Sequence, residues 1–211
     1  MNGITLQSVE QYMYRLLPPR DAVLADMERV AEKNDVPIVG PAVGRLLYQL
    51  ARFVNAGRVF EMGSAIGYST IWWARGLRRG GKVYYTDGSS ANAAQAEGYL
   101  QKAGVRDRVE ILVGNALDLI DQVEGEFDIV FNDVDKHDYP EVFRKAAGRI
   151  RVGGLLVADN VLWSGRVADA PVRDRDTTAI RSFNKMLFSD ERFYSTIIPL
   201  RDGVAIGLRV Q

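Results

Sequence analysis

Apolar residues recur every three or four positions through the first fifty residues, which is the spacing of amphipathic helices. A Pro-Pro pair at 18–19 ends the first helical segment, and Asp21 stands where the second begins. Two further prolines enclose a short extended stretch, 38–40, and a third helical segment follows it. The apolar positions of the three segments are Leu6, Val9, Met13, Leu16 and Leu17, then Val23, Leu24, Met27, Val30 and Ala31, then Val43, Leu46, Leu47 and Leu50. The pattern therefore predicts a helical cap over residues 1–56.

From residue 58 onward, short apolar runs alternate with helical segments. Strands alternating with helices indicate a parallel sheet with helices on both faces. An α/β core over residues 57–211 is therefore expected. The pattern predicts strands at 59–62, 83–86, 109–113, 127–131 and 155–158, and helices at 68–77, 91–103 and 139–150.

The end of the chain departs from this alternation. Two apolar runs, 193–200 and 204–210, are joined only by the tripeptide Arg-Asp-Gly. A connection this short makes a hairpin, so these two strands must be antiparallel and the sheet must end in a reversed strand. The stretch 164–178 has little apolar content and predicts a long loop, a kind of segment that often carries function.

Composition limits the chemistry that the chain can perform. Its 211 residues, 47% of them hydrophobic and 26% charged, are typical of one soluble domain. With no Cys and one His, it has no disulfide, no thiolate chemistry and no two-His metal site, so any metal ligands should be oxygens. The 27 basic and 27 acidic residues balance, which argues against a nucleic-acid partner. Without a membrane-length apolar run or a signal-peptide pattern, we expect a cytoplasmic protein.

A glycine turn between the first predicted strand and its helix suggests a ligand site. Gly63 and Gly67 allow a sharp turn, and Asp87 ends the next strand, where it can accept hydrogen bonds from ribose hydroxyls. Ala65 stands where a dinucleotide-binding loop has the glycine that admits a pyrophosphate. A nucleoside without phosphates needs no such cradle, and the sulfonium of S-adenosylmethionine suits Glu61 and Asp87. The alternative is a plain turn with packing glycines.

Oxygen-bearing side chains follow two further strands. Asp133 and Asp135 come after the strand at 127–131, and Asp159 and Asn160 follow the strand at 155–158. If these strands are neighbours, Asp133, Asp159 and Asn160 converge outside the sheet, because ligands bind at the carboxyl ends of parallel strands. Two carboxylates and an amide suit a hard divalent cation. The alternative is ordinary turn and cap chemistry, which is common for Asp and Asn.

The loop after the first of these strands also carries Lys136, His137 and Asp138. Asp138 precedes a helical segment and is interpreted as a helix cap. His137 has no visible Ser partner, so a catalytic triad is disfavoured, and we interpret it as an outward-facing polar residue. Lys136 follows Asp135 on the loop that leads away from the expected cation site, and this position makes it a candidate catalytic residue. The alternative is a solvated surface lysine.

Several blocks in order along nearly the whole chain resemble one family. They are LLPPRDAVL, VPIVGPAVGRLL, VFEMGSAIGYST, FDIVFNDVDKHDYP, GGLLVADNVLWSGRV and PLRDGVAIGLRV. The family comprises the cation-dependent, S-adenosylmethionine-dependent O-methyltransferases of the caffeoyl-CoA and bacterial catechol type. The resemblance implies one domain with the Rossmann-like class I methyltransferase fold, a seven-stranded mostly parallel sheet with an antiparallel last strand and extra N-terminal helices.

The resemblance also implies site residues and an assembly. Lys136 matches the family's proposed catalytic lysine, and Asp135 and Ser164 fall where the acceptor would bind. The loop departs from the family pattern at Ser64-Ala65-Ile66, and Val134, Asp138 and Gly88-Ser89-Ser90 differ too. Homodimers are usual in the family. The expected cofactor-binding residues are Val39, Glu61, Gly63, Ser64, Ser69, Asp87, Ala116 and Asp133, and the expected metal ligands are Asp133, Asp159 and Asn160.

These observations predict methyl transfer to a hydroxyl of a catechol or another small phenol. A divalent cation, Mg²⁺ with Ca²⁺ or Mn²⁺ as alternatives, would hold both acceptor oxygens, and a neutral Lys136 would take the proton. The alternative acceptor is a caffeoyl-CoA-like ester, although the charges of the loop 164–178 sum to zero and offer no phosphate site. A nucleic-acid methyltransferase, a nicotinamide oxidoreductase and a non-enzymatic cofactor-binding module are the remaining alternatives.

Overall fold

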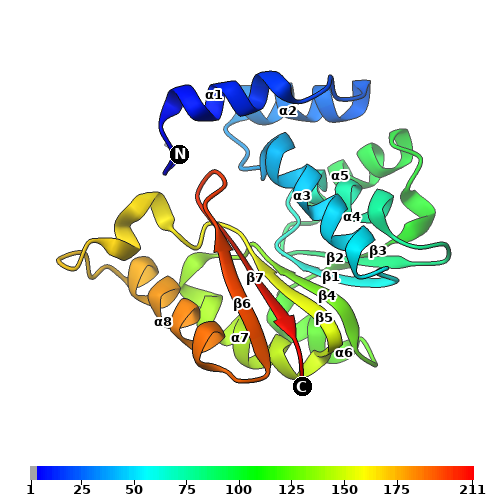
Figure 1. Ribbon diagram of the computed structural model, residues 1–211. Coiled ribbons are helices and arrows are strands. Elements are labelled where there is room, and N and C mark those ends of the chain that lie inside the picture. The colour runs from blue at the N-terminus through cyan, green and yellow to red at the C-terminus, as the bar shows by residue number, and fades with distance from the viewer. Residues whose placement is uncertain (1–3) are drawn as a thin grey trace.

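The computed structural model describes residues 4–211, and its centre is a seven-stranded sheet with helices on both faces (Figure 1). The strand order is β3-β2-β1-β4-β5-β7-β6, in which β7 runs antiparallel to both β5 and β6. This confirms the predicted fold, including the reversed last strand. The strands are β1 Arg58–Met62, β2 Lys82–Asp87, β3 Val109–Val113, β4 Phe127–Asn132, β5 Ile150–Ala158, β6 Phe193–Ile198 and β7 Val204–Arg209.

Alternate residues of the central strands face opposite sides and are buried on both. Val59 and Ile129 pack in one apolar cluster with α2 to α5, whereas Phe60 and Val130 pack in the other with α6 to α8. This burial on both faces explains why the strands are continuous apolar runs in the sequence. The helices are α1 Gln7–Leu16, α2 Ala22–Asn34, α3 Gly40–Phe53, α4 Tyr68–Gly76, α5 Ser90–Lys102, α6 Ala116–Gln122, α7 Tyr139–Ala146 and α8 Arg175–Ser189.

The predicted N-terminal helices are present. Asp21 caps α2 by accepting hydrogen bonds from the backbone of residues 23 and 24. Pro41 does not enclose an extended stretch as expected; it lies in the first turn of α3, where a missing N–H costs nothing. The division into a 1–56 cap and a 57–211 core stays a prediction, and residues 1–3 of that cap lie outside the described residues.

Some predicted boundaries are wrong for local reasons. The helix expected over 139–150 ends at Ala146 and passes through a short 3₁₀ turn into β5. The short helix α6 was not expected; it begins after Asn115, whose side chain accepts the backbone N–H of Leu117. The expected loop 164–178 contains a 3₁₀ turn, Trp163–Ala168, and its last four residues already belong to α8.

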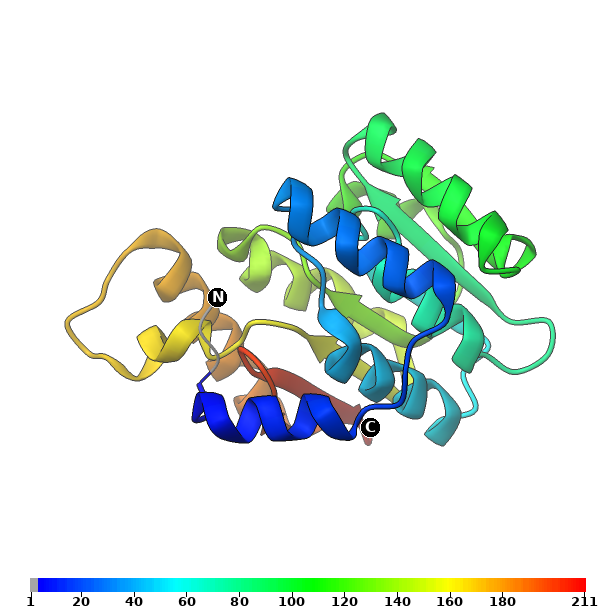
Figure 2. The same ribbon diagram turned by 90° about the horizontal axis from the view of Figure 1, so that it is seen from above.

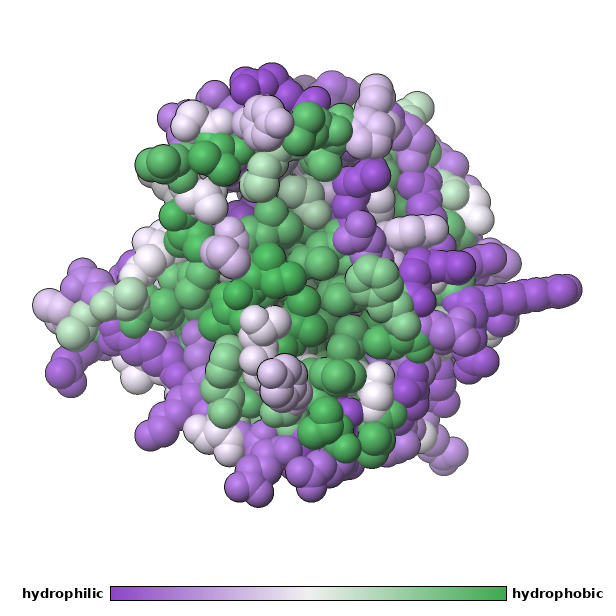
Figure 3. All heavy atoms as spheres, viewed as in Figure 1, coloured by the Kyte–Doolittle hydropathy of each residue, from purple (hydrophilic) through white to green (hydrophobic). Residues whose placement is uncertain are grey.

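Seen from above, the segment between β5 and α8 reaches away from the rest of the molecule, and α1 crosses near the tip of the β6–β7 hairpin (Figure 2). Apolar side chains gather on the face where β6 and β7 carry no helix (Figure 3). Tyr194 of β6 and Leu208 of β7 are exposed there. None of the helices in residues 4–211 combines the length and the apolar character that crossing a bilayer requires.

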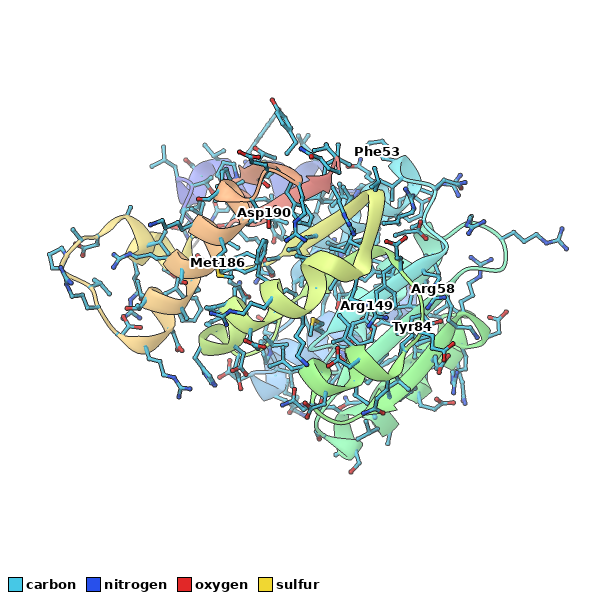
Figure 4. All side chains as sticks on the ribbon, turned by 90° about the horizontal axis from the view of Figure 1, so that it is seen from below. Phe53, Arg58, Tyr84, Arg149, Met186 and Asp190 are labelled. Atoms are coloured by element: carbon cyan, nitrogen blue, oxygen red, sulfur yellow. The ribbon has the colours of Figure 1, made fainter. Side chains whose placement is uncertain are left out.

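The underside of the sheet carries packed basic side chains (Figure 4). The guanidinium carbon of Arg58 lies 5.4 Å from the ring centres of both Tyr84 and Phe127, and that of Arg149 lies 5.3 Å from Phe127. Guanidinium groups over aromatic faces are stabilising contacts. Arg58 and Phe127 begin their strands and Arg149 directly precedes β5, so these contacts lie at the opposite end of the sheet from the expected site residues.

Candidate functional site

The expected cofactor residues gather at the carboxyl edge of neighbouring strands. The order β3-β2-β1-β4 places the turns after these four strands side by side, and the chain reverses its direction across the sheet between β1 and β4. Such a switch point is where open α/β sheets bind ligands. Glu61, Gly63, Ser64, Asp87 and Asp133 lie at or directly after these strand ends. Ser69 and Ala116 lie in the first turns of the helices α4 and α6 that follow, and Val39 is buried in the segment ahead of α3.

Gly63 allows two of these turns to touch. Its φ is +83°, and a Cβ built on it would lie 2.4 Å from the backbone oxygen of Asp133. A side chain at this position would therefore push the turn after β1 away from the turn after β4. Asp133 in turn donates its N–H to the carbonyl of Met62, at 2.9 Å.

Glu61 is fully buried beside this turn. Its Oε2 accepts a hydrogen bond from the hydroxyl of Thr70, and the nearby hydroxyls of Ser69 and Ser64 also act to lower its pKa. Burial nevertheless raises the pKa of Glu61 to about 7. Its Oε1 has no partner among the described residues. A buried acceptor without a donor fits a ligand that brings an ammonium or hydroxyl group to donate, or a sulfonium whose positive charge the carboxylate attracts.

Asp87 is held rigidly by three donors. Its Oδ2 accepts the N–H of Ala65 at 3.0 Å, and its Oδ1 accepts the N–H of Ser89 at 2.8 Å and the amide of Asn92 at 3.1 Å. Ala65 has φ +44°, the left-handed conformation that glycine adopts more easily. The Ala65 N–H is therefore committed to a carboxylate, which is consistent with a loop that does not cradle phosphate.

The strands β4 and β5 are neighbours, which was the condition under which Asp133, Asp159 and Asn160 were expected to converge. Asn132 pairs with Ala158 in parallel register, and Asp159 donates its N–H to the carbonyl of Asn132 at 3.1 Å. Burial raises the pKa of Asp159, and the charge of Asp133 raises it further. Burial also raises the pKa of Asp133, against the opposing charge of Lys136. The buried carboxyl group of Asp159 and the partly buried one of Asp133 thus repel each other.

This donor set fits a hard divalent cation. Two carboxylates and the Asn160 amide offer oxygens, and a nearby cation would relieve the repulsion between Asp133 and Asp159. Asn160 has φ +55° and donates its N–H to the Oδ1 of Asp159 at 2.9 Å, so its backbone is fixed beside the pair. Within residues 4–211, no group of three His, Cys, Asp or Glu side chains is arranged to hold a metal. A cation here would therefore need oxygens from water or an acceptor to complete its shell.

Lys136 differs from the expected neutral amine. Its Nζ lies 3.0 Å from Asp133 Oδ1, 2.9 Å from the Tyr139 hydroxyl and 3.3 Å from the carbonyl of Val134. The Tyr139 hydroxyl donates its own proton to the carbonyl of Asp159, so all three neighbours of Nζ are acceptors. Burial lowers the pKa of Lys136, but Tyr139 and Asp133 outweigh it and raise the pKa above its ordinary value. These contacts favour the ammonium form of Lys136 over the neutral amine that the sequence analysis expected.

The remaining polar residues of this loop are exposed or partly exposed. Asp135 is exposed, and Asp138 makes no capping hydrogen bond to α7, which corrects the prediction of a helix cap. The backbone of Asp138 has helical φ and ψ angles, whereas a capping side chain requires an extended residue. His137 is partly exposed and lies 3.7 Å from the carboxylates of Asp138 and Asp176.

Ser164 is held by a residue that sequence reasoning missed. It has φ +53°, and its N–H donates to Asp202 Oδ1 in the turn between β6 and β7. Asp202 is buried, and its Oδ2 has no partner among residues 4–211. Tyr139 was missed as well. Both residues stand in the quoted sequence blocks, but Asp202 looks like an ordinary turn residue and Tyr139 like an ordinary helix residue.

Comparison with known proteins identifies relatives over almost the full length. A family model described as O-methyltransferase matches residues 19–210. The catechol O-methyltransferase of Niastella koreensis is 35% identical over 219 residues, covering 99% of this chain and 99% of that protein. The caffeoyl-CoA O-methyltransferase of Eucalyptus gunnii is 31% identical, covering 98% of this chain and 90% of that protein.

Solved structures agree with these relatives. The O-methyltransferase of Bacillus cereus in complex with SAH superposes with a TM-score of 0.87 at 32% identity, covering 96% of this chain and 97% of that chain. The O-methyltransferase of tomaymycin synthesis from Streptomyces achromogenes, in complex with SAM, gives a TM-score of 0.88 at 33% identity, covering 97% of this chain and 96% of that chain. These similarities extend over almost the full length of the chain.

Proposed function

This chain belongs to the O-methyltransferase family, and we propose that it transfers a methyl group from S-adenosylmethionine to one hydroxyl of a catechol-like small molecule with the help of a divalent cation. The observation that carries the proposal is the arrangement at the ends of β4 and β5. There Asp133, Asp159 and Asn160 supply oxygen ligands beside the ammonium of Lys136.

The methyl-donor site is proposed at the turns after β1, β2 and β3. Structural relatives bound to SAM and to SAH support this ligand. Bound S-adenosylmethionine supplies a methyl group activated on a sulfonium. Asp87, already oriented by three donors, would accept from the ribose hydroxyls, and the unpartnered Oε1 of Glu61 would accept from the positively charged end. Val39, Gly63, Ser64, Ser69, Ala116 and Asp133 would line this site.

Asp133, Asp159 and Asn160 would hold the cation, for which Mg²⁺ is the first choice and Ca²⁺ or Mn²⁺ the alternatives. A bound cation lowers the pKa of a hydroxyl that it contacts and holds vicinal oxygens in place. Asp135 and Ser164 would border the acceptor.

Lys136 would act in this site as an ammonium. Its charge would stabilise the negative charge that develops on the acceptor oxygen, because preorganised donors in a buried site favour such charge. Asp133 and Tyr139 hold Nζ in place for this role. The geometry thus favours charge stabilisation over the proton-accepting role that the sequence suggested.

A small free catechol is favoured over a CoA ester. A CoA ester carries phosphates, which require available basic side chains. In the segment between β5 and α8, Arg166 is ion-paired with Asp174 at 2.7 Å, and Arg181 of α8 is hydrogen-bonded to backbone carbonyls. Arg173 and Arg175 are exposed, but the acidic residues of 164–178 balance their charge. The catechol O-methyltransferase of Niastella koreensis supports the same choice, whereas the Eucalyptus relative is named for a CoA ester.

The proposal is tested by transfer of a radiolabelled methyl group from S-adenosylmethionine to a panel of catechols, with and without a chelator. We expect chelation and Asp133→Ala each to reduce turnover about 100-fold or more, since both remove the ion that activates the hydroxyl. Asp118→Ala, an exposed aspartate on α6, is the matched control and should leave turnover unchanged. Circular dichroism checks that both variants fold.

Lys136→Met should also reduce turnover in this assay, whereas Lys136→Arg, which keeps a positive charge but cannot accept a proton, should retain more of it. Full activity after exhaustive chelation would contradict the cation, and equal loss in both lysine variants would contradict the ammonium role. Absence of methylation on every catechol would contradict the acceptor class.

We also propose that the chain forms a homodimer. The helix α1 has no buried residue, and its apolar side chains Leu6, Val9 and Leu16 are exposed. Together with the open face of β6 and β7 they make a large apolar surface (Figure 3). Surfaces of this kind are characteristic of protein interfaces.

A further inference from the structure

The turn between β6 and β7 joins three separate parts of the chain beside the candidate site. Its residue Arg201 accepts the N–H of Ile4 at 3.1 Å through its carbonyl. The carbonyl of Asp202 accepts the N–H of Leu162 at 2.9 Å, and that of Gly203 accepts the N–H of Val161 at 3.1 Å. The turn is therefore attached directly to the residues that follow Asp159 and Asn160. Figures 1 and 2 show the same turn next to α1.

The side chain of Arg201 extends from this turn toward the segment ahead of α3. Its Nη1 donates to the carbonyl of Ile38 at 2.8 Å. A Cβ built on Gly40 would lie 3.1 Å from Arg201 Nη1 and 3.4 Å from the hydroxyl of Tyr14. The guanidinium and the phenol of Tyr14 thus meet over the bare backbone of Gly40, between the expected cofactor segment and the loop that follows the expected metal ligands.

Most hydrogen-bond donors of Arg201 and Tyr14 have no acceptor among residues 4–211. The bond to Ile38 is the one side-chain hydrogen bond that Arg201 makes to residues 4–211, and it uses one of five guanidinium N–H groups. The Tyr14 hydroxyl likewise has no hydrogen-bond partner in the described part of the chain.

We infer that Arg201, assisted by the Tyr14 hydroxyl, binds an anionic substituent of the methyl acceptor, so that the preferred acceptors are catechols that carry a carboxylate. This inference rests on the proposed function and specifies its substrate class. A guanidinium binds a carboxylate through two parallel hydrogen bonds. A catechol without a substituent cannot form these bonds, and the guanidinium would repel a catechol that carries an ammonium group. Arg201 is then a specificity residue that touches the acceptor away from the reacting oxygen.

The test compares three acceptors that differ in charge: 1,2-dihydroxybenzene, 3,4-dihydroxybenzoate and 2-(3,4-dihydroxyphenyl)ethylamine. In the unchanged protein, kcat/KM should be about tenfold or more higher for the benzoate than for the neutral catechol, and lowest for the amine. Arg201→Gln should remove most of the preference for the benzoate and change the neutral catechol by less than about threefold. Tyr14→Phe should act in the same direction, with a smaller loss.

Arg192→Gln is the matched control, because Arg192 is an equally half-buried arginine at the other end of the same hairpin, paired with Asp190. It should leave the order of the three acceptors unchanged. A uniform loss on all three acceptors in Arg201→Gln would show that Arg201 only tethers the hairpin, and a preference of the unchanged protein for the amine would also overturn the inference. Failure of every acceptor would instead contradict the proposed function.

Discussion

The pKa values of two buried carboxyl groups in this protein, Glu61 and Asp128, are shifted in opposite directions because different groups donate hydrogen bonds to them. Burial raises the pKa of Glu61 to about 7, since only hydroxyl groups donate to it. Burial also acts on Asp128, but Arg151 and the backbone N–H groups of residues 57 and 58 donate to that carboxylate and lower its pKa overall. The charge of a buried acid is therefore decided by the groups that surround it.

The first prediction concerns Glu61. Its pKa rises from 4.5 to about 7 on folding, so the neutral form is favoured in the folded state, and the stability that this confers is lost as pH rises through 7. Glu61→Gln keeps a neutral group at every pH. Urea unfolding at pH 5 and pH 8 should show that the unchanged protein loses about 3 kcal/mol more than this variant over that range.

Glu110→Gln, at an exposed position on β3, is the control for this measurement and should follow the unchanged protein at both pH values. If Glu61→Gln and the unchanged protein lose the same free energy of unfolding between pH 5 and pH 8, Glu61 is ionised in the folded state throughout.

The segment between β5 and α8 is organised by a single arginine on α8. The guanidinium of Arg181 donates to the carbonyls of Val167 at 2.9 Å, Val172 at 2.5 Å and Arg166 at 2.9 Å, and also to that of Asp169. Trp163, Ser164 and Gly165 all have positive φ at the start of this segment. A stretch with few apolar residues is thus given a defined shape by one side chain and one buried aspartate.

Arg181→Met should release this segment while α8 stays folded. We expect KM for the acceptor to rise about tenfold with a smaller change in kcat, because an unformed binding segment must be ordered when the acceptor binds. Steady-state kinetics with a catechol that the unchanged protein methylates would measure this KM. Lys185→Met, which removes an exposed charge from the same helix, should leave KM unchanged. An unaltered KM in Arg181→Met would mean that the segment does not contact the acceptor.

The sheet is covered unevenly when the whole molecule is considered. Helices α3 to α5 pack over β1 to β4 on one face, but β6 and β7 lie open on that face and α1 lies above them without burying its own apolar residues (Figures 1 and 3). Tyr194, near the start of the edge strand β6, is 79% exposed. Exposed apolar edges are an aggregation risk unless a partner covers them, which supports the proposed dimer.

Light scattering after size exclusion should give twice the chain mass of 23.5 kDa. Tyr194→Lys should shift the protein to the monomer. Dimerisation would bury the lysine charge in an apolar interface, and the free energy this costs exceeds what one side chain contributes to a stable dimer. Val113→Lys, at a 50% exposed apolar position on the opposite edge strand, should leave the mass unchanged. A single-chain mass for the unchanged protein would refute the dimer.

The order of strands and helices, the reversed last strand and the glycine turn could be predicted from the sequence, because each depends on periodicity or on residues close together in the chain. The absence of Cys and the single His exclude thiolate and two-His metal sites from composition alone. The helix α6 and the end of α7 were predicted poorly, since short helices depend on caps and on packing against the sheet more than on periodicity.

Contacts between distant segments were decided by the tertiary structure alone. Pairing of β4 with β5 brought Asp133 and Asp159 together, and the fold placed Tyr139 so that Lys136 stays an ammonium. Only the folded chain placed Arg201, a residue of a hairpin turn, over Gly40. A side chain's charge state and partners depend on the groups that surround it in space, and residues far apart in the chain supply most of those groups.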